Sequence, residues 1–217
     1  MLSTSAFVAL AMQCATSVHP DTAHEVARVE SGYNPYAIAE IIPKDKRKPG
    51  DSGVITHLPQ TKEAALQVIK RIESTNRRFS VGLMQITSTN FTKYGVNAEK
   101  LLNPCPNLSV FEKILVDCYL RGGSLQNALS CYYSGNFITG KKTEPTFNNT
   151  SYTQRIGFKN TDKKNNWVVP SVKEEIDKEN NQSHSRINKP TEITVYPQYA
   201  MRGAVSDDKE TNDVENE

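Results

Sequence analysis

Glu30 is the side chain in this sequence whose position best suits acid chemistry. It lies in the stretch "AHEVARVES", whose apolar spacing predicts a helix that Gly32 stops. On that helix Ala23, Val26 and Ala27 share a face with Glu30, so we expect the carboxyl to be partly buried at the carbonyl end. Desolvation disfavours the anion there, and the negative end of the helix dipole repels it. A carboxyl kept protonated near neutral pH can donate a proton to a glycosidic oxygen.

The sequence offers no obvious second carboxylate of the kind that most glycosidases use. Glu40 and Asp51 are the nearest alternatives, but both lie in or beside the charged loop "PKDKRKPGDSG", where we expect them to be solvated. Glu30 could itself turn outward at the helix end and have no catalytic role. This residue alone therefore does not establish an enzyme.

Three short motifs follow one another along the chain, namely "ESGYNPYAI", "SVGLMQI" and "CYYSGN". In this order they resemble the lytic transglycosylases of the goose-type lysozyme superfamily, over roughly residues 7–158. The stretches "QCATSVHPDT" and "NPCPNLSVFEKILVDCY" look like the branch of that family associated with type IV secretion systems. In the third motif Cys131 and Tyr133 stand where the family usually has Ala and Asn. This departure changes the hydrogen bonding expected at that helix end.

The resemblance implies a reaction that needs only one protein carboxyl. The N-acetyl group of N-acetylmuramic acid (MurNAc) acts as the internal nucleophile and gives an oxazolinium-type intermediate. Glu30 protonates the leaving oxygen and then acts as base on the C6 hydroxyl, which closes a 1,6-anhydro ring without water entering the product. The bond that is cut joins MurNAc to N-acetylglucosamine (GlcNAc) in peptidoglycan, and no cofactor or metal is implied.

By their positions in the family motifs, six further residues are expected to bind the substrate: Ser31, Gly82, Met84, Gln85, Tyr132 and Tyr152. Gly82 would let the backbone approach the sugar, and Gln85, beside Met84 in the cleft wall, would donate a hydrogen bond to an acetamido or hydroxyl group. Tyr132 would orient the Glu30 carboxyl or the acetamido group, and Tyr152 would close the cleft. Ser31 would hydrogen-bond near the same site. Ser31 and Tyr152 have plainer alternatives, as a helix-end residue and a packed aromatic residue.

The elements that must hold these residues are mostly helices. The apolar stretch 6–15 predicts a first helix, although an atypical export signal overlapping it is an alternative. Helical periodicity recurs in "TKEAALQVIKRIEST", "LSVFEKILVDCYLRGG" and "SLQNALSCYYSGN", with a short extended piece at "GVITHLPQ". We therefore expect a mainly α-helical α+β, lysozyme-like domain over residues 1–158. Residues 159–217 are polar and predict a disordered tail, in which "EITVYPQYAM" is a short strand or docking motif.

Four cysteines, Cys14, Cys105, Cys118 and Cys131, suit either disulfides in an oxidising compartment or buried thiols. They allow three pairings that sequence alone cannot choose between, with Cys105–Cys118 as a possible short-loop disulfide. No CxxC and no His at ligand spacing accompany them, so we expect no zinc site. The sequence has no Gly-rich phosphate loop, no basic patch interleaved with aromatics and no stretch long enough to cross a bilayer. We therefore expect no nucleic-acid partner and no membrane span.

Together these features favour a peptidoglycan lytic transglycosylase in the periplasm of a Gram-negative bacterium. By resemblance it would act on glycan strands and locally open the cell wall for a type IV secretion or conjugation apparatus, whose components would be its partners. Two alternatives remain open. One is a hydrolytic muramidase with an unrecognised second carboxylate, and the other is a non-catalytic, peptidoglycan-binding assembly factor.

Overall fold

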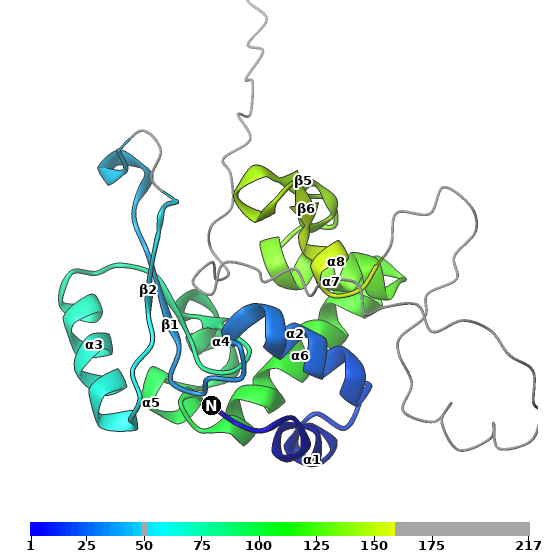
Figure 1. Cartoon of the computed structure of the whole chain (residues 1–217), viewed down its shortest axis with the longest axis horizontal. Coiled ribbons are helices and arrows are strands. Elements are labelled where there is room, and N and C mark those ends of the chain that lie inside the picture. Colours follow the sequence, from blue (N-terminus) through cyan, green and yellow to red (C-terminus); the bar gives the residue numbers. More distant parts are fainter. Residues whose placement is uncertain (49–51, 159–217) are drawn as a thin grey trace, which may run out of the picture.

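The computed structural model of the protein describes residues 1–48 and 52–158 (Figure 1). The expected tail at 159–217, with its "EITVYPQYAM" segment, lies outside the described residues, as does Asp51. The helices are α1 (Thr4–Cys14), α2 (Pro20–Ser31), α3 (Lys62–Ser74), α4 (Phe91–Tyr94), α5 (Ala98–Leu101), α6 (Pro104–Gly122), α7 (Leu125–Ser134) and α8 (Tyr152–Arg155). The strands are β1 (Ile38–Ile41), β2 (Val54–His57), β3 (Phe79–Val81), β4 (Ile86–Thr87), β5 (Thr143–Glu144) and β6 (Thr150–Ser151). Single turns of 3-10 helix are η1 (Lys44–Lys46), η2 (Ser88–Asn90), η3 (Thr139–Lys141) and η4 (Pro145–Phe147).

The helical body is organised around α6, the longest of these helices. It packs against α1, α5 and α7, and α1 packs against α2. Buried apolar side chains such as Phe7, Val26, Phe111 and Leu129 form one continuous core across these helices. The expected N-terminal helix is confirmed as α1, whose Phe7 is completely buried in that core. None of the helices in the described residues is both long and apolar enough to cross a bilayer.

A four-stranded antiparallel sheet runs beside the helical body, with the strand order β2-β1-β3-β4. Ala39 in β1 lies opposite Thr56 in β2 and Ser80 in β3, which fixes the register. Figure 1 shows the sheet between α3 and the other helices, with the β1–β2 hairpin projecting past them and carrying η1 near its tip. α3 covers the sheet because its apolar stripe, with Ile69 and Ile72 buried, packs toward β1.

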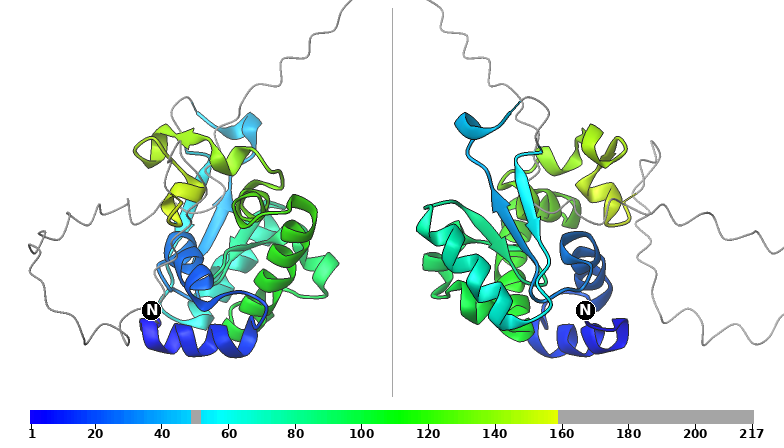
Figure 2. Two further views of the ribbon diagram at one scale, coloured as in Figure 1. Left: turned by 90° about the vertical axis from the view of Figure 1, so that its right-hand side faces the viewer. Right: turned by 60° about the vertical axis from the view of Figure 1, so that its left-hand side comes forward.

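The C-terminal part of the described chain forms a separate corner of the fold. Its two-stranded sheet β5–β6 leads into α8, and α8 packs against α7 and η3. Figure 2 shows this corner at the end of the molecule opposite α1. The corner therefore places Tyr152, the first residue of α8, over α7. The expectation of a mainly helical α+β domain is confirmed.

Two disulfides join the helices, Cys14–Cys105 and Cys118–Cys131. The first ties the end of α1 to the start of α6, and the second ties α6 to α7. The expected short-loop pair Cys105–Cys118 is wrong. Both residues lie on α6, and a rise of 1.5 Å per residue puts them about 20 Å apart, far beyond disulfide reach. The sequence predicted a helix over part of this segment but not that it extends back to Cys105.

Candidate active site

Glu30 points inward from the last turn of α2. The helix begins at Pro20, where the His19 side chain caps the Asp21 amide, and ends at Gly32 in the left-handed conformation with φ 56°. The spacing Ala23, Val26, Ala27, Glu30 places the carboxyl on the face that packs into the core, and it is 1% exposed. The expected burial is confirmed, and the alternative of a boundary residue turned toward solvent is wrong.

Tyr152 supplies a hydrogen bond to this carboxyl. Its hydroxyl donates to Glu30 Oε1 at 2.6 Å, although 122 residues separate the two. α8 is held in place by a capping box, in which the Ser151 and Gln154 side chains each bind the other's backbone amide. A hydroxyl donated to one carboxylate oxygen stabilises the anion that is left after the acid has given up its proton. The sequence predicted that Tyr152 closes the cleft, whereas the structure places it on the acid itself.

Tyr133, one of the two residues that depart from the family pattern, packs against Tyr152. The two rings stack with centroids 4.3 Å apart and an interplanar angle of 15°. The Tyr133 hydroxyl donates to Glu144 Oε1 at 2.6 Å, and burial together with the charge of Glu144 raises the pKa of Tyr133 far above its usual value. Tyr133 therefore carries no negative charge in the working pH range, and it links the acid to the β5–β6 corner.

A buried ion pair anchors this arrangement. Arg155 Nη2 lies 2.8 Å from Glu144 Oε2, Arg155 Nη1 donates to the Thr150 carbonyl, and the guanidinium lies 3.8 Å from the centroid of the Phe147 ring. Glu144 is thus neutralised by Arg155 and also accepts the Tyr133 hydroxyl. The sequence did not mark Glu144 and Arg155 as partners. Glu144 lies in the short strand β5 and Arg155 in the short helix α8, and neither element is long enough to show a pattern.

The "GLMQ" turn between β3 and β4 is built for internal packing. A Cβ on Gly82, at φ 80°, would lie 2.2 Å from Asn107 Nδ2 and 2.6 Å from the Leu101 carbonyl oxygen. This glycine is required by the approach of α6 and α5, and the expectation that it also lets the backbone approach the sugar stays a prediction. Asn107 is completely buried, accepts from the Met84 amide, and donates to the Val81 and Leu101 carbonyls. The signal for Asn107 was available in the sequence, since it lies one helical turn before Phe111 on the apolar face of α6.

Gln85 and Tyr132 also use their donors within the protein. Both N–H groups of the Gln85 amide donate to backbone carbonyls, those of Ala37 at 3.0 Å and Gly82 at 2.9 Å. The Tyr132 hydroxyl donates to the Met84 carbonyl. These bonds hold the two side chains within the fold, and the roles expected for Gln85 toward an acetamido or hydroxyl group and for Tyr132 toward the Glu30 carboxyl or the acetamido group stay predictions. With the completely buried Met84, the two residues tie the turn between β3 and β4 to α7 and to the segment before β1.

Ser31 bonds within its own helix end, which is the alternative that the sequence offered for it. Its hydroxyl donates to the Ala27 carbonyl at 3.2 Å, within the last turn of α2, and the residue is buried. That bond closes the helix end from which Glu30 projects. Of the expected site residues, the structure therefore brings Glu30 and Tyr152 into direct contact and arranges the others around them.

Glu40 does not lie in solvent as the sequence predicted. It is 4% exposed in the middle of the sheet, where Arg77 Nη1 donates to one carboxylate oxygen and His57 Nε2 lies 3.0 Å from the other. Burial acts to raise the pKa of Glu40, but the hydrogen bonds and charges of Arg77 and His57 outweigh it and hold that pKa below its ordinary value. The sequence misplaced Glu40 because the charged loop begins only a few residues beyond it.

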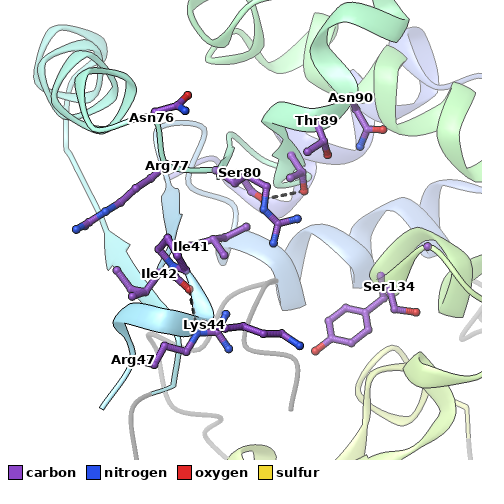
Figure 3. A pocket seen from close by; sticks show the side chains of 15 residues that line it. Ile41, Ile42, Lys44, Arg47, Asn76, Arg77, Ser80, Thr89, Asn90 and Ser134 are labelled. Atoms are coloured by element: carbon purple, nitrogen blue, oxygen red, sulfur yellow. Dashed lines mark hydrogen bonds between the residues drawn. The ribbon is translucent and has the colours of Figure 1, made fainter. Parts of the chain in front are cut away.

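A cavity of about 580 Å³ lies between the sheet and the end of α7 (Figure 3). Ser80 and Thr87 line it from β3 and β4, with their hydroxyls 2.9 Å apart, and Tyr133, Ser134 and Gly135 line it from α7. The Tyr133 ring connects this cavity to the acid, because it stacks on the tyrosine that contacts Glu30. In the part of the chain that the structure describes, no group of His, Cys, Asp and Glu side chains is arranged to hold a metal ion.

A small antiparallel sheet against a helical body, with a buried acid at the end of α2, defines a lysozyme-like domain. The chain belongs to the transglycosylase SLT domain family, whose model matches residues 7–154.

Among curated proteins, the chain is similar to the type IV secretion system protein virB1 of Brucella abortus biovar 1 (strain 9-941). The two are 36% identical over 159 residues, which cover 69% of this chain and 62% of the relative. It is also 34% identical over 146 residues to protein virB1 of Agrobacterium fabrum, covering 64% of this chain and 56% of that protein. The chain thus spans less than two thirds of the length of these relatives. No solved structure shows a significant match.

Proposed function

We propose that this protein is a peptidoglycan lytic transglycosylase that cuts the bond between MurNAc and GlcNAc and leaves a 1,6-anhydro product. The observation that carries the proposal is the Glu30 carboxyl, buried at the end of α2 and hydrogen-bonded by Tyr152 at 2.6 Å. A buried carboxyl beside a neutral donor suits an acid that gives up its proton and later takes one back.

The proposed reaction runs in two steps. Glu30 first gives its proton to the glycosidic oxygen while the bond from that oxygen to MurNAc C1 breaks, and the acetamido oxygen of the same sugar bonds to C1. The Glu30 carboxylate, stabilised by the Tyr152 hydroxyl, then takes the proton of the C6 hydroxyl. O6 attacks C1 and displaces the acetamido oxygen, so Glu30 ends protonated and no water is consumed.

The surroundings of the other buried carboxylates support this reaction over hydrolysis. Glu40 is engaged by Arg77 and His57, and Glu144 by Arg155 and Tyr133. A carboxylate that activates water needs an open lone pair facing the sugar. Both groups instead point their oxygens at cationic or hydroxyl partners, which favours the internal acetamido group as nucleophile.

The setting of this activity is taken from the relatives. The relative from Brucella abortus is a type IV secretion system protein. We accordingly propose that this protein works in the periplasm of a Gram-negative bacterium, opening glycan strands locally for a secretion or conjugation apparatus and contacting components of that apparatus.

The test is mass spectrometry of the muropeptides released from purified sacculi by the full-length protein. We expect products one water lighter than the hydrated muropeptides, and we expect none from Glu30→Gln. Glu63→Gln, the same substitution in the first turn of α3, is the matched control and should release the same products as the unaltered protein. Hydrated products would instead identify a muramidase. Tight retention on sacculi without any release would identify a non-catalytic binding factor.

A further inference from the structure

The cavity between the sheet and the end of α7 has a basic wall. Lys44 and Arg47 line it from the β1–β2 hairpin, and Arg77 and Arg78 line it where the chain enters β3. Figure 3 shows Lys44 and Arg47 on the hairpin side and Ser134 across the cavity from them. The lining described by the structure contains neither Asp nor Glu. Glu30 and the residues expected to bind the sugar are absent from this lining, so the cavity is a separate feature of the cleft.

Contacts within the protein orient the side chains of Arg77 and Arg47. Arg77 is paired with Glu40, and in Figure 3 its side chain extends away from the centre of the cavity. Arg47 Nε donates to the Ile42 carbonyl at 2.9 Å, which fixes the plane of its guanidinium at the rim. Lys44 and Arg78 are exposed. The wall therefore presents several positive charges on fixed backbone beside neutral hydroxyl and amide groups.

The other wall supplies a surface for an uncharged partner. Tyr133, Ser134 and Gly135 lie opposite the basic residues, and the hydroxyl pair of Ser80 and Thr87 lies on the strands between them. The volume of about 580 Å³ falls in the range of sites that hold a small ligand group. A ligand that fits has a neutral hydroxyl-bearing part and an anionic part on one side.

We propose that this cavity binds the carboxylates of the peptides carried by peptidoglycan, so that the protein prefers peptide-bearing strands to bare glycan. The proposal rests on the proposed function, since it takes peptidoglycan to be the substrate. In peptide-bearing strands the lactyl carboxyl of MurNAc is held in the amide bond to the peptide, so the sugars are neutral and the peptides supply the carboxylates. Arginine and lysine side chains are the donors that bind such groups through charge-assisted hydrogen bonds.

The experiment measures binding of full-length Glu30→Gln, which does not turn over, to two preparations of sacculi. One retains its peptides. The other has been stripped of them by an amidase, which leaves a single lactyl carboxylate on each MurNAc in place of the several carboxylates of a peptide. We expect tighter binding to the peptide-bearing preparation, with the difference shrinking as salt is added. Adding Lys44→Gln and Arg78→Gln should reduce that preference about tenfold, through the loss of two charged contacts.

A matched control carries Lys70→Gln and Lys113→Gln, two exposed lysines outside the cavity lining, and has the same net charge as the cavity variant. It should keep the preference. Arg78→Glu alone is a second test and should also lower the preference, because it places a carboxylate in the wall. Equal binding to both preparations, or a preference that survives both cavity variants, would overturn the proposal. Since binding is read without turnover, a failure of the proposed chemistry shows separately, as the absence of anhydro products from the unaltered protein.

Discussion

Glu30 and Glu40 are buried to nearly the same extent, yet their surroundings prepare them for different tasks. Glu30, at the end of α2, receives the neutral hydroxyl of Tyr152. Glu40, in the middle of the sheet, is held by Arg77 and His57, and its pKa is lowered even though burial acts in the opposite direction. Burial alone therefore does not make a carboxyl into an acid catalyst. The charge of its hydrogen-bond partners decides whether a buried carboxyl is held as an anion or can serve as an acid.

Glu144 shows the same rule in a third place. It is as buried as Glu40, but Arg155 neutralises it and Tyr133 donates to it. The protein thus uses two buried carboxylates to hold the structure and keeps one beside a neutral partner. Through the stacked Tyr133–Tyr152 pair, the structural carboxylate Glu144 supports the acid Glu30.

The largest expected effect is the difference in reaction rate between Glu30→Gln and Glu40→Gln. Glu30→Gln should lower the rate of anhydromuropeptide release by about a thousandfold, because general acid–base catalysis contributes about 10²–10⁴. Glu40→Gln should keep most of the rate and instead lower the free energy of unfolding by about 2 kcal/mol, since it leaves Arg77 without its carboxylate. Rate assays and urea unfolding of both variants measure this contrast. Comparable losses of rate in the two would remove the distinction drawn between them.

The ion pair in the C-terminal corner should give the next largest effect. Arg155→Met leaves Glu144 buried without its cation, and we expect the free energy of unfolding to fall by about 3 kcal/mol. The double variant Arg155→Met, Glu144→Gln should lose less, because no uncompensated charge remains. Urea unfolding of the single and double variants tests this. A single variant as stable as the unaltered protein would show that the pair does not anchor α8.

Removing the neutral donor from Glu30 should have a moderate effect on the rate. Tyr152→Phe keeps the ring stack but removes the hydroxyl from the carboxyl, and we expect release to slow about tenfold, the equivalent of about 1.4 kcal/mol. The alkaline limb of the pH–rate profile should also move to higher pH, because the anion has lost a stabilising donor. Tyr119→Phe, on the exposed side of α6, is the matched control and should change neither quantity. A lower rate with an unmoved profile would assign Tyr152 to packing alone.

The smallest expected effect concerns acid stability. The pKa of Glu40 is lower in the folded protein than its ordinary value of 4.5, so more protons bind to the unfolded state as the pH falls. The stability contributed by Glu40 is therefore fully present above 4.5 and is lost as the pH falls through the lowered pKa. The difference in unfolding free energy between the unaltered protein and Glu40→Gln should therefore narrow over that interval. Urea unfolding at a series of pH values measures it, and a difference independent of pH would contradict the assigned partners.

Several features were predictable because they depend on residues close in the chain. The burial of Glu30 follows from the periodicity of α2 and from the glycine that ends it, and the main helices follow from their apolar stripes. The disulfide pairing was not predictable, because it depends on which helices lie together. The extension of α6 over both Cys105 and Cys118 is what rules out the pair expected from loop length.

The sequence predicted which residues belong to the site better than it predicted their contacts, because those contacts join segments that are distant in the chain. The motifs predicted Gly82, Gln85 and Tyr132 as site residues, but the contacts of these residues depend on other parts of the fold. Gln85 and Tyr132 donate to backbone carbonyls, and Gly82 lies against Asn107. Tyr133 was visible as a departure from the family pattern. Its contacts with Glu144 and Tyr152 required the fold of the β5–β6 corner.

The sequence by itself determined that a carboxyl at position 30 would point into the domain, because helix geometry is set by residues within a few turns. Only the tertiary structure decided that this carboxyl would accept from a neutral hydroxyl while Glu40 and Glu144 form ion pairs with arginines. Tyr152 reaches it from 122 residues away, while Arg77 and Arg155 reach Glu40 and Glu144. The properties of a buried acid depend on the charges around it, and the folded chain brings those charges together from distant segments.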